Sequence, residues 1–597
     1  MTQTRTVELD ITEDGRYRLK SSPLDKDNCK LVPGAKWNPE TATWDAPLSW
    51  AATKAIRGIF GDRLAVTEAV IKKATEMYTE IVMPAYEARN AMDTNSPTVL
   101  ELRGTTKFTL RHFQEAGSAY LRMVERGCLF DPMGTGKTAQ VISALRLLPQ
   151  ELTFPALVVC PNSVKSSWVR EVALWAPHLR IIDFGNTAKA RAAAIKAMKA
   201  GEADIMVVNW ESLSKNSSLA SFGAHKPTRG EKTPGPLNEI AWQTVIADEA
   251  HRGKNPAAKQ TRALWALAHS KSVNFRYGMT GTPMANSPID LWSIFHFVRP
   301  DEFPSRSRFM DRYCLLGFGD WGGVQVLGLK PETRDEFDEI SSYLWRRTPK
   351  EIALPELPPK VPVLRECEMT TAQKKQYDAM RDTMVVEMQE EESAVVAVNA
   401  ISRLTRLLQF ASATATLSSD NEVLLKDPSC KIDELEDILD ELEPSEQVVV
   451  FAVSRKLIEL AAARLDKKGI SYGMITGKVS NDERTNNVNK FQDKKLRVML
   501  STIAAGGVGI TLTAANTMVF LQRSFSAIDN SQAEDRCHRI GSEVHESITI
   551  IDVVSKGTLD EHVLDIAGMK KEALQDLVRD GARLAALIKN GTLEEAA

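Results

Sequence analysis

The sequence lacks the features that mark secreted proteins, proteins stabilised by a structural metal ion and membrane-spanning proteins. Its seven cysteines are scattered and form no C-x-x-C pair, which argues against a disulfide framework or a zinc site. It has no run of about 18 apolar residues, and its first ten residues contain no apolar signal core. We therefore expect an intracellular protein without a membrane span, cytoplasmic in a bacterium or phage and nuclear in a eukaryote.

An excess of positive charge is also missing. The chain has 75 basic and 78 acidic side chains, a formal net charge of −3. Nucleic-acid binders often carry a basic domain, so any grip on DNA would have to come from a local cleft. The 597 residues predict about three to five domains at roughly 150 residues each. The apolar share of 43% is that of an ordinary globular protein.

A glycine-rich stretch follows the short apolar run at 128–130 and precedes a segment suited to a helix. A strand, a glycine-rich turn and a helix form the cradle that binds nucleotide phosphates through backbone N–H groups and the helix dipole. The first glycine of the usual pattern is replaced by an aspartate, so an ordinary turn with a surface lysine is the alternative. The stretch consists of Asp131, Pro132, Met133, Gly134, Thr135, Gly136, Lys137 and Thr138.

Two acidic residues, Asp248 and Glu249, directly follow the apolar run at 245–247. Ligands bind at the carboxyl ends of parallel strands, where such residues would lie. Asp248 can hold Mg²⁺ and Glu249 can polarise an attacking water. A solvated acidic loop is the alternative. Further on, the hydroxyls of the Gly278–Pro283 segment suit a switch that senses the nucleotide, although a plain Gly-Pro turn has the same composition.

The later part of the chain offers arginines for the same chemistry. Arg536 and Arg539 lie three residues apart, so on a helix they would share a face. Two such guanidiniums can neutralise charge on a transferring phosphoryl group. A glycine-rich loop containing Gly507 and Gly509 precedes them and would expose its backbone to a nucleotide. Arginines at this spacing on a solvated face are the alternative.

Apolar runs alternate with helical patterns in two separate regions, which predicts two lobes built on parallel sheets. Before them, Asp14-Gly15 joins two short alternating runs and predicts a hairpin. Trp37 and Trp44 follow, either as core residues of a small domain or as part of a nucleic-acid-binding face. The Ser214–Asn238 segment predicts a solvent-exposed, mobile insertion. The predicted strands are 156–160, 181–183, 205–208, 245–247, 448–451, 497–500, 518–521 and 548–551.

In their order, these motifs resemble the superfamily 2 helicase-like ATPases of the Swi/Snf group over roughly residues 105 to 570. The resemblance rests on Leu110–Gln114, Asp131–Thr138, Val159–Pro161 with Trp168, Asp248–His251 with Lys254 and Asn255, Met279–Pro283 with Asn286, Arg346-Arg347, Leu357–Lys360, Gln373 with Tyr377, Val450-Phe451, Ser501–Gly509, Gln532–Gly541 and Gly557-Thr558. In this family the first position of the phosphate loop is commonly acidic. Two departures, Ser542 and Ser524–Ser526, remove no catalytic group.

The resemblance implies an α/β fold with two RecA-like parallel-sheet lobes and helical insertions, preceded by a small α+β N-terminal module. We expect the module at 1–95, lobe 1 at 100–300, a helical region at 301–430, lobe 2 at 431–570 and a helical tail at 571–597. The 509–515 and 532–536 segments are most similar to the annealing-helicase branch. The Pro33–Leu48 segment is similar to that branch's HARP module, which engages branched DNA.

The implied activity is a DNA-dependent ATPase that moves along duplex or branched DNA, remodelling forks or reannealing strands in replication and repair. Gln114 would read adenine, and Lys137 and Thr138 would hold the phosphates and Mg²⁺. Asp248 and Glu249, the start of a DEAH-type box, would serve metal and water, with Arg536 and Arg539 acting as fingers across a cleft. The expected ligands are ATP, Mg²⁺ and DNA, bound by a monomer. Alternatives are a strand-separating helicase, an RNA-directed motor and a DNA-structure-binding scaffold with an ATP-switched grip.

Overall fold

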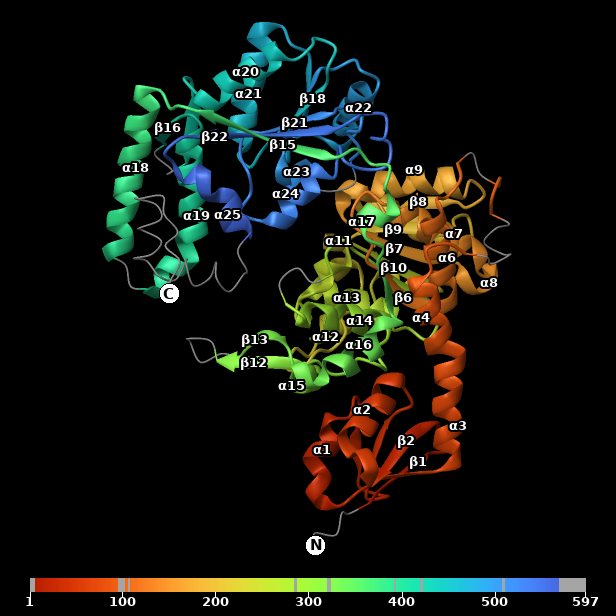
Figure 1. Ribbon diagram of the computed structural model, residues 1–597. Coiled ribbons are helices and arrows are strands. Elements are labelled where there is room, and N and C mark those ends of the chain that lie inside the picture. Colours follow the sequence, from red (N-terminus) through yellow and green to blue (C-terminus); the bar gives the residue numbers. More distant parts are fainter. Residues whose placement is uncertain are drawn as a thin grey trace. The chain divides into compact units, whose positions relative to one another are not determined.

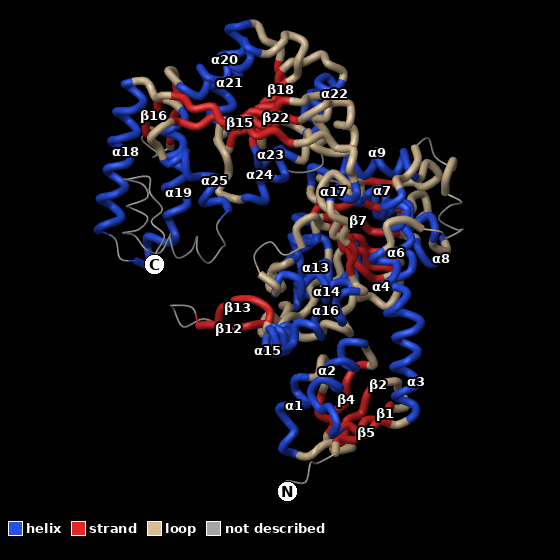
Figure 2. Tube along the Cα trace, in the orientation of Figure 1, coloured by secondary structure: helices blue, strands red, loops and turns tan. Residues whose placement is uncertain are grey.

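The computed structural model describes residues 6–94, 102–105, 108–283, 287–318, 324–390, 393–418, 422–506 and 510–568. The chain forms two compact units, Met1–Ala353 and Leu354–Ala597. Each unit is built around a parallel sheet, and the first also contains a small mixed sheet at its N-terminal end (Figures 1 and 2). The expected α/β fold with two RecA-like lobes and a small α+β module is confirmed.

The N-terminal module is a five-stranded sheet in the order β3-β4-β2-β1-β5. The predicted hairpin is confirmed, since β1 and β2 pair antiparallel and Gly15 between them has a φ of 74°. Trp44 is buried, whereas Trp37 packs edge-on against it at 5.5 Å and is 50% exposed. One tryptophan is therefore core and the other lies at the surface. The strands are β1 (Val7–Ile11), β2 (Arg16–Lys20), β3 (Lys36–Asn38), β4 (Thr43–Pro47) and β5 (Leu64–Val66).

Helix α2 (Trp50–Phe60) packs on this sheet and begins at Ser49, whose hydroxyl accepts from the N–H of Ala52. The two N–H groups at its start donate to the carboxylate of Glu302, at 3.0 and 2.6 Å. A carboxylate at a helix N-terminus satisfies free donors and complements the dipole. The module is thereby fixed to the rest of the first unit. Helix α1 spans Lys26–Leu31.

A long helical strut leaves the module. It consists of α3 (Glu68–Glu76), a π-helical turn (Met77–Val82) and α4 (Met83–Asn90) in direct succession. Figure 1 shows α3 running from the small sheet toward α4. Helix α4 packs against α6 (His112–Val124) of the first lobe, so the strut connects the module to that lobe.

The first lobe has a seven-stranded sheet in the order β14-β6-β11-β10-β7-β9-β8, with every pairing parallel. Its strands at 156–160 and 181–183 match the predicted bounds. The first is buried on both faces and is therefore a continuous apolar run. The strands are β6 (Arg126–Leu129), β7 (Ala156–Cys160), β8 (Ile181–Asp183), β9 (Ile205–Asn209), β10 (Thr244–Asp248), β11 (Phe275–Met279) and β14 (Trp345–Arg346).

Helices lie on both sides of this sheet, with α6, α7 and α9 packed together and α11, α13 and α14 forming a second group (Figure 1). Their bounds are α7 (Lys137–Leu147), α8 (Gln150–Thr153), α9 (Lys165–Trp175), α10 (Ala188–Lys199), α11 (Trp210–Asn216), α12 (Arg229–Lys232), α13 (Lys259–Ala268) and α14 (Ile289–Val298).

The Ser214–Asn238 segment is only partly the exposed insertion that its composition predicts. Leu219 and Leu237 are buried, and the Nε of Arg262 donates to the carbonyl of Ala220 at 2.7 Å. The two leucines are enough to anchor a segment that is otherwise rich in polar and loop-forming residues. Most residues between 221 and 234 are exposed, as predicted, whereas buried residues anchor the two ends of the segment.

The stretch that follows the first lobe folds back onto the first unit. It contains α15 (Arg306–Tyr313), the hairpin of β12 (Cys314–Phe318) and β13 (Val324–Leu329), α16 (Arg334–Ser342), and α17 (Lys350–Ala353). Between α16 and α17, β14 adds to the edge of the seven-stranded sheet beside β6. The domain limits expected between residues 300 and 431 stay predictions.

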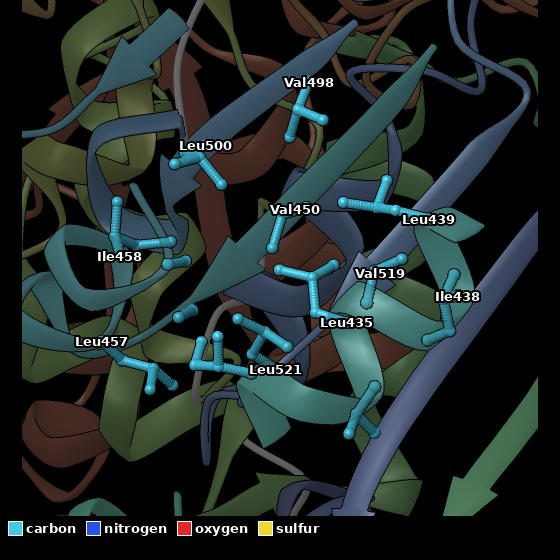
Figure 3. Packing of buried hydrophobic residues seen from close by; sticks show 14 of the residues in the cluster. Leu435, Ile438, Leu439, Val450, Leu457, Ile458, Val498, Leu500, Val519 and Leu521 are labelled. Atoms are coloured by element: carbon cyan, nitrogen blue, oxygen red, sulfur yellow. The ribbon is translucent and has the colours of Figure 1, made fainter. Parts of the chain in front are cut away.

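The second unit has a six-stranded parallel sheet in the order β15-β22-β21-β18-β20-β19. Strand β18 lies inside it, and Val450 packs with Leu435 and Leu500 in the core shown in Figure 3. Each such fully buried aliphatic side chain stabilises the fold by about 1.5–3 kcal/mol. The strands are β15 (Lys360–Cys367), β18 (Val448–Ala452), β19 (Tyr472–Ile475), β20 (Val498–Thr502), β21 (Thr517–Phe520) and β22 (Ile548–Ser555).

Two helices, α18 (Thr371–Glu390) and α19 (Ser393–Ser412), lie within the helical region expected at 301–430. The tail expected at 571–597 lies outside the described residues. The remaining elements are β16 (Thr414–Leu417), β17 (Val423–Lys426), α20 (Cys430–Glu441), α21 (Arg455–Lys468), α22 (Asn481–Gln492), α23 (Ile503–Gly506), α24 (Ala527–Glu534) and α25 (Val563–Gly568).

All seven cysteines are buried and none forms a disulfide. In the described part of the chain, no helix is both long and apolar enough to cross a membrane.

Candidate nucleotide site

The glycine-rich stretch forms the turn between β6 and α7, as predicted. Gly134 and Gly136 have φ angles of 78° and 76°, a conformation that side chains with a Cβ rarely adopt. The Nζ of Lys137 donates to the carbonyls of Asp131 and Pro132 at 2.9 and 3.0 Å. The ammonium is therefore held against the turn at the start of α7, where a helix N-terminus favours an anion.

The carboxylate of Asp131 faces the protein interior. It is fully buried, and its two oxygens accept from the backbone N–H of Thr348 at 2.7 Å and from the Nε2 of Gln140 at 3.0 Å. Burial raises its pKa, and these two hydrogen bonds act in the opposite direction. Asp131 thus ties the turn to the segment after β14 and to α7. Neither partner was found from the sequence, because a backbone N–H and a helix-interior glutamine leave no motif.

Gln114, expected to read adenine, lies in α6 directly beside the turn. It is buried, its Oε1 accepts from the N–H of Arg111 at 2.9 Å, and its Nε2 donates to the carbonyl of Thr135 at 2.9 Å. One amide therefore closes the start of α6 and connects that helix to the phosphate turn. Adenine recognition by Gln114 stays a prediction.

Asp248 is the last residue of β10, and its carboxylate accepts two hydrogen bonds. Its Oδ2 accepts from the indole N–H of Trp168 at 2.9 Å, and its Oδ1 from the N–H of Glu249 at 2.9 Å. Burial and the neighbouring Glu249 charge raise the pKa of Asp248 to about 6, although the Trp168 bond and the charge of Lys137 oppose the shift. The carboxylate is held in place at the carboxyl edge of the sheet, where it is costly to keep charged.

Glu249 connects this edge to the Gly278–Pro283 segment through a histidine. Its backbone has a φ of 51°, a left-handed conformation that non-glycine residues adopt mainly at special sites. Its Oε2 lies 3.3 Å from the Nδ1 of His251, and the same nitrogen lies 2.9 Å from the Oγ1 of Thr280. The Thr280 hydroxyl therefore contacts the His251 imidazole, which also lies beside the carboxylate of Glu249. His251 had no assigned role in the sequence, since its partner is 29 residues away.

The sheet order brings these groups together, because β6, β11 and β10 are neighbours and their carboxyl ends meet at one edge. The close fit is visible at Gly281, where an added Cβ would lie 3.1 Å from the Cγ and 3.3 Å from the N of Met133. The segment after β11 therefore packs directly on the phosphate turn. Phosphate turn, acidic pair and Thr280 form one site within the first unit.

In the second unit, Arg536 and Arg539 are not on a helix. Helix α24 ends at Glu534, and the carbonyl of Arg536 accepts from the N–H of Leu512 at 2.9 Å. This long-range bond uses a carbonyl that a continuing helix would need, so the predicted shared helical face was wrong. Arg536 is 3% exposed, and the Nη1 of Arg539 donates to the carbonyl of Ile510 at 3.3 Å.

The two arginines still lie in one turn region. Each contacts the segment that begins at residue 510, Arg536 through its backbone carbonyl and Arg539 through its side chain. Gly507 and Gly509 lie outside the described residues, as does Asn286 of the first unit. The structure therefore assembles the first-unit part of the expected site, whereas the catalytic role of the two arginines stays a prediction.

Comparison with known proteins gives a consistent answer over most of the chain. Residues 77–415 match the SNF2-related domain, and residues 430–541 match the helicase conserved C-terminal domain. An uncharacterized ATP-dependent helicase of Mycoplasma genitalium is 28% identical over 491 residues, which are 79% of this chain and 42% of that protein. The transcription regulatory protein SNF2 of Saccharomyces cerevisiae is 26% identical over 76% of this chain and 26% of its own length.

A solved Sulfolobus solfataricus SWI2/SNF2 ATPase core in complex with dsDNA is 25% identical, with a TM-score of 0.35 over 80% of this chain and 95% of that one. The chain spans less than half the length of the curated relatives named above. The SNF2-related match alone covers more than half of the 597 residues. The chain therefore belongs to the SNF2-related family of helicase-like ATPases.

Proposed function

We propose that this protein is a DNA-stimulated ATPase that uses ATP hydrolysis to move along duplex or branched DNA. The observation that carries the proposal is the joining of the phosphate turn, the Asp248–Glu249 pair and Thr280 at one sheet edge. Relatives named as ATP-dependent helicases and chromatin-remodelling ATPases support the same chemistry.

The roles follow from the groups present. Backbone N–H groups of the turn and the Lys137 ammonium would bind the phosphates, since both supply donors at a helix N-terminus. Glu249, oriented by His251, would orient and deprotonate the attacking water. Arg536 and Arg539 would add positive charge to the phosphoryl group during turnover. Each role is carried by a group whose chemistry suits a charged, transferring phosphate.

Mg²⁺ fits this donor set as an ion that arrives with the nucleotide. Among the described residues, no group of three His, Cys, Asp or Glu side chains could hold a metal. Mg²⁺ is commonly bound by one or two protein oxygens together with phosphates and waters. The Thr138 hydroxyl and the Asp248 carboxylate would hold it, and the ion would neutralise charge on the phosphates.

The test is ATP hydrolysis measured with and without duplex DNA. We expect DNA to raise the rate and Lys137→Ala to abolish it, with Lys271→Ala as a matched control away from the site. A rate that is indifferent to DNA would remove the motor from the proposal. Unchanged hydrolysis in Lys137→Ala would remove the assigned ATP site.

The finer proposal is that the module directs the motor to branched DNA, for fork remodelling or strand reannealing. A cavity of about 880 Å³ lies between the module, the strut and the first lobe. Its lining includes the aromatic rings of Trp50, Tyr78 and Tyr86 and the cations Lys54 and Arg89. Aromatic faces beside basic groups are the usual platform for unpaired bases.

The comparison that tests this is ATPase stimulation by single-stranded, duplex and forked DNA, in the wild type and in Tyr78→Ala. Tyr78 and Tyr86 are 42% and 43% exposed, so their removal leaves the core intact. We expect Tyr78→Ala to lose the preference for forks while duplex stimulation persists. Equal stimulation by forks and plain duplexes in the wild type would overturn the branched-DNA proposal alone.

A further inference from the structure

The strut that leaves the N-terminal module ends on a buried arginine of the first lobe. The Nη1 of Arg346 donates to the carbonyls of Ala88 and Arg89, at 3.0 and 2.7 Å. These carbonyls belong to the last turn of α4, whose carbonyls have no partner within the helix. A cation at this position also complements the negative end of the helix dipole. Arg346 is fully buried, so this contact is made away from solvent.

The backbone around Arg346 holds the phosphate turn. Strand β14 pairs with β6, and the carbonyl of Arg346 accepts from the N–H of Phe130 at 2.8 Å. Two residues later, the N–H of Thr348 donates to the carboxylate of Asp131 at 2.7 Å. One short strand therefore contacts α4 through a side chain and the start of the phosphate turn through its backbone.

The two buried charges, Arg346 and Asp131, attract each other. Burial lowers the pKa of Arg346 and raises that of Asp131, and in each case the opposite charge of the other residue counteracts the shift. A buried charge is tolerated only when it is paired or hydrogen-bonded. The removal of the guanidinium would therefore leave the Asp131 carboxylate with less support inside the fold.

The guanidinium has donors that its present acceptors do not use. Among the described residues, neither the Nε nor the Nη2 of Arg346 has a hydrogen-bond acceptor, and the Oε1 of Gln140 has no donor. The lack of a side chain at Gly117 makes room for the Gln140 amide, because an added Cβ would lie 1.8 Å from the Oε1 of Gln140 and 3.7 Å from the Nε of Arg346. Gln140 is the same side chain that donates to Asp131. Arg346 therefore has unused donors near Gln140, on the side of the phosphate turn.

We propose that Arg346 is a positioning residue through which the strut helix of the N-terminal module sets the conformation of the phosphate turn. The proposal rests on the assignment of that turn as the ATP site. A displacement of α4 removes two acceptors from a buried guanidinium. The guanidinium then turns toward Asp131 and Gln140, and Asp131 exchanges its bond to Thr348 for one to Arg346. A displacement of the module that moves α4 therefore changes the affinity of the phosphate turn for ATP.

The first experiment compares Arg346→Met with Arg347→Met in the full chain. Arg347 is the exposed neighbour, so it controls for the loss of a positive charge at this point of the sequence. The readouts are the Kd of a fluorescent ATP analogue without DNA, and KM and kcat with DNA. We expect Arg346→Met to raise Kd and KM about fivefold or more, with kcat changing less. Arg347→Met should keep the wild-type Kd.

A conservative variant separates positioning from folding. Arg346→Lys keeps the charge near Asp131 but loses the planar fork that reaches two carbonyls. We expect Arg346→Lys to have a Kd between those of the wild type and Arg346→Met. The melting temperature of each variant is measured as the control for folding. A wild-type Kd in a folded Arg346→Met protein would overturn the proposal. If Arg346→Met does not fold, an unchanged Kd in Arg346→Lys overturns it equally.

The second experiment tests the route from the helix. Ala88→Gly loosens the last turn of α4 without touching the nucleotide site. We expect it to raise the Kd in the wild type and to have no further effect in Arg346→Met, since both changes would break the same connection. Additive effects would overturn the coupling. A wrong assignment of the ATP site would give a different result. In that case Lys137→Ala would bind the fluorescent nucleotide with the same Kd as the wild type.

Discussion

His251 and Thr280 contact each other across the carboxyl edge of the first sheet, with Nδ1 and Oγ1 2.9 Å apart. The same imidazole nitrogen lies 3.3 Å from the Oε2 of Glu249. A hydroxyl directly after β11 therefore helps to fix the ring that orients the expected catalytic carboxylate. Thr280 is fully buried, so water does not compete for this contact.

This relationship predicts a kinetic effect of Thr280→Ala. Loss of an orienting partner of a functional side chain typically costs about 10- to 100-fold. We expect that loss in kcat, with KM for ATP nearly unchanged, because the phosphate turn is untouched. Thr280→Ser, which keeps the hydroxyl, should retain most of the activity. The measurement is steady-state hydrolysis at saturating DNA, and an equal loss in both variants would contradict it.

The raised pKa of Asp248, about 6, predicts an acid limit for Mg²⁺-dependent nucleotide affinity. Only the ionised carboxylate holds a metal, so affinity should fall as pH drops through the Asp248 pKa. Trp168→Phe removes a donor that stabilises the carboxylate, so the limit should move to higher pH. Glu249→Gln removes a neighbouring negative charge, so the acid limit should move to lower pH. Titration of nucleotide affinity at fixed Mg²⁺ checks both signs, and shifts in the same direction would refute the assignment.

Arg539 offers the cleaner test of the proposed arginine fingers. Arg536 is almost fully buried and its carbonyl holds Leu512, so its substitution also disturbs the fold. Arg539 is only half-buried. We expect Arg539→Ala to lower the single-turnover rate about 10³-fold, with ATP affinity kept within a few-fold. The control is an unchanged melting temperature, and a rate close to wild type would remove Arg539 from the catalytic set.

Gln114 allows adenine recognition to be tested beside the structural role of the same side chain. Its Oε1 holds the start of α6, whereas its Nε2 holds the Thr135 carbonyl. Gln114→Glu keeps the first acceptor and loses the donor; Gln114→Ala loses both. If the side chain also reads adenine, both variants should lose preference for ATP over GTP. Both should also lose stability, because Gln114→Glu buries a carboxylate oxygen against the Thr135 carbonyl. Competition binding with the two nucleotides measures this, and intact discrimination in Gln114→Ala would exclude adenine reading.

Much of the architecture was predictable because buried parallel strands are continuous apolar runs. Strand β7 at 156–160 and strand β18 at 448–452 illustrate this, since each is fully buried and bounded by polar or turn residues. The hairpin at Asp14-Gly15 was predictable for a local reason, the positive φ that glycine adopts in the turn. Local chemistry was sufficient in these places.

The sequence did not predict what depends on long-range partners. Strand β14 has only two residues, too few for any periodic pattern, yet it carries Arg346. The end of α24 at Glu534 is set by a bond to Leu512, and the 532–541 pattern alone favours a longer helix. The Asp131–Thr348 bond joins residues 217 positions apart. Such contacts are decided by the assembled fold, which no local spacing encodes.

The burial of all seven cysteines has a practical consequence. Thiol-reactive dyes attack thiolates that solvent can reach, so the native chain should label slowly. One cysteine introduced in each unit, at exposed positions such as Lys196 and Lys467, would then carry a donor and an acceptor dye with little background. Single-molecule energy transfer between the dyes would then report the distance between the two labelled positions at each stage of the ATP cycle, without prior removal of any native thiol.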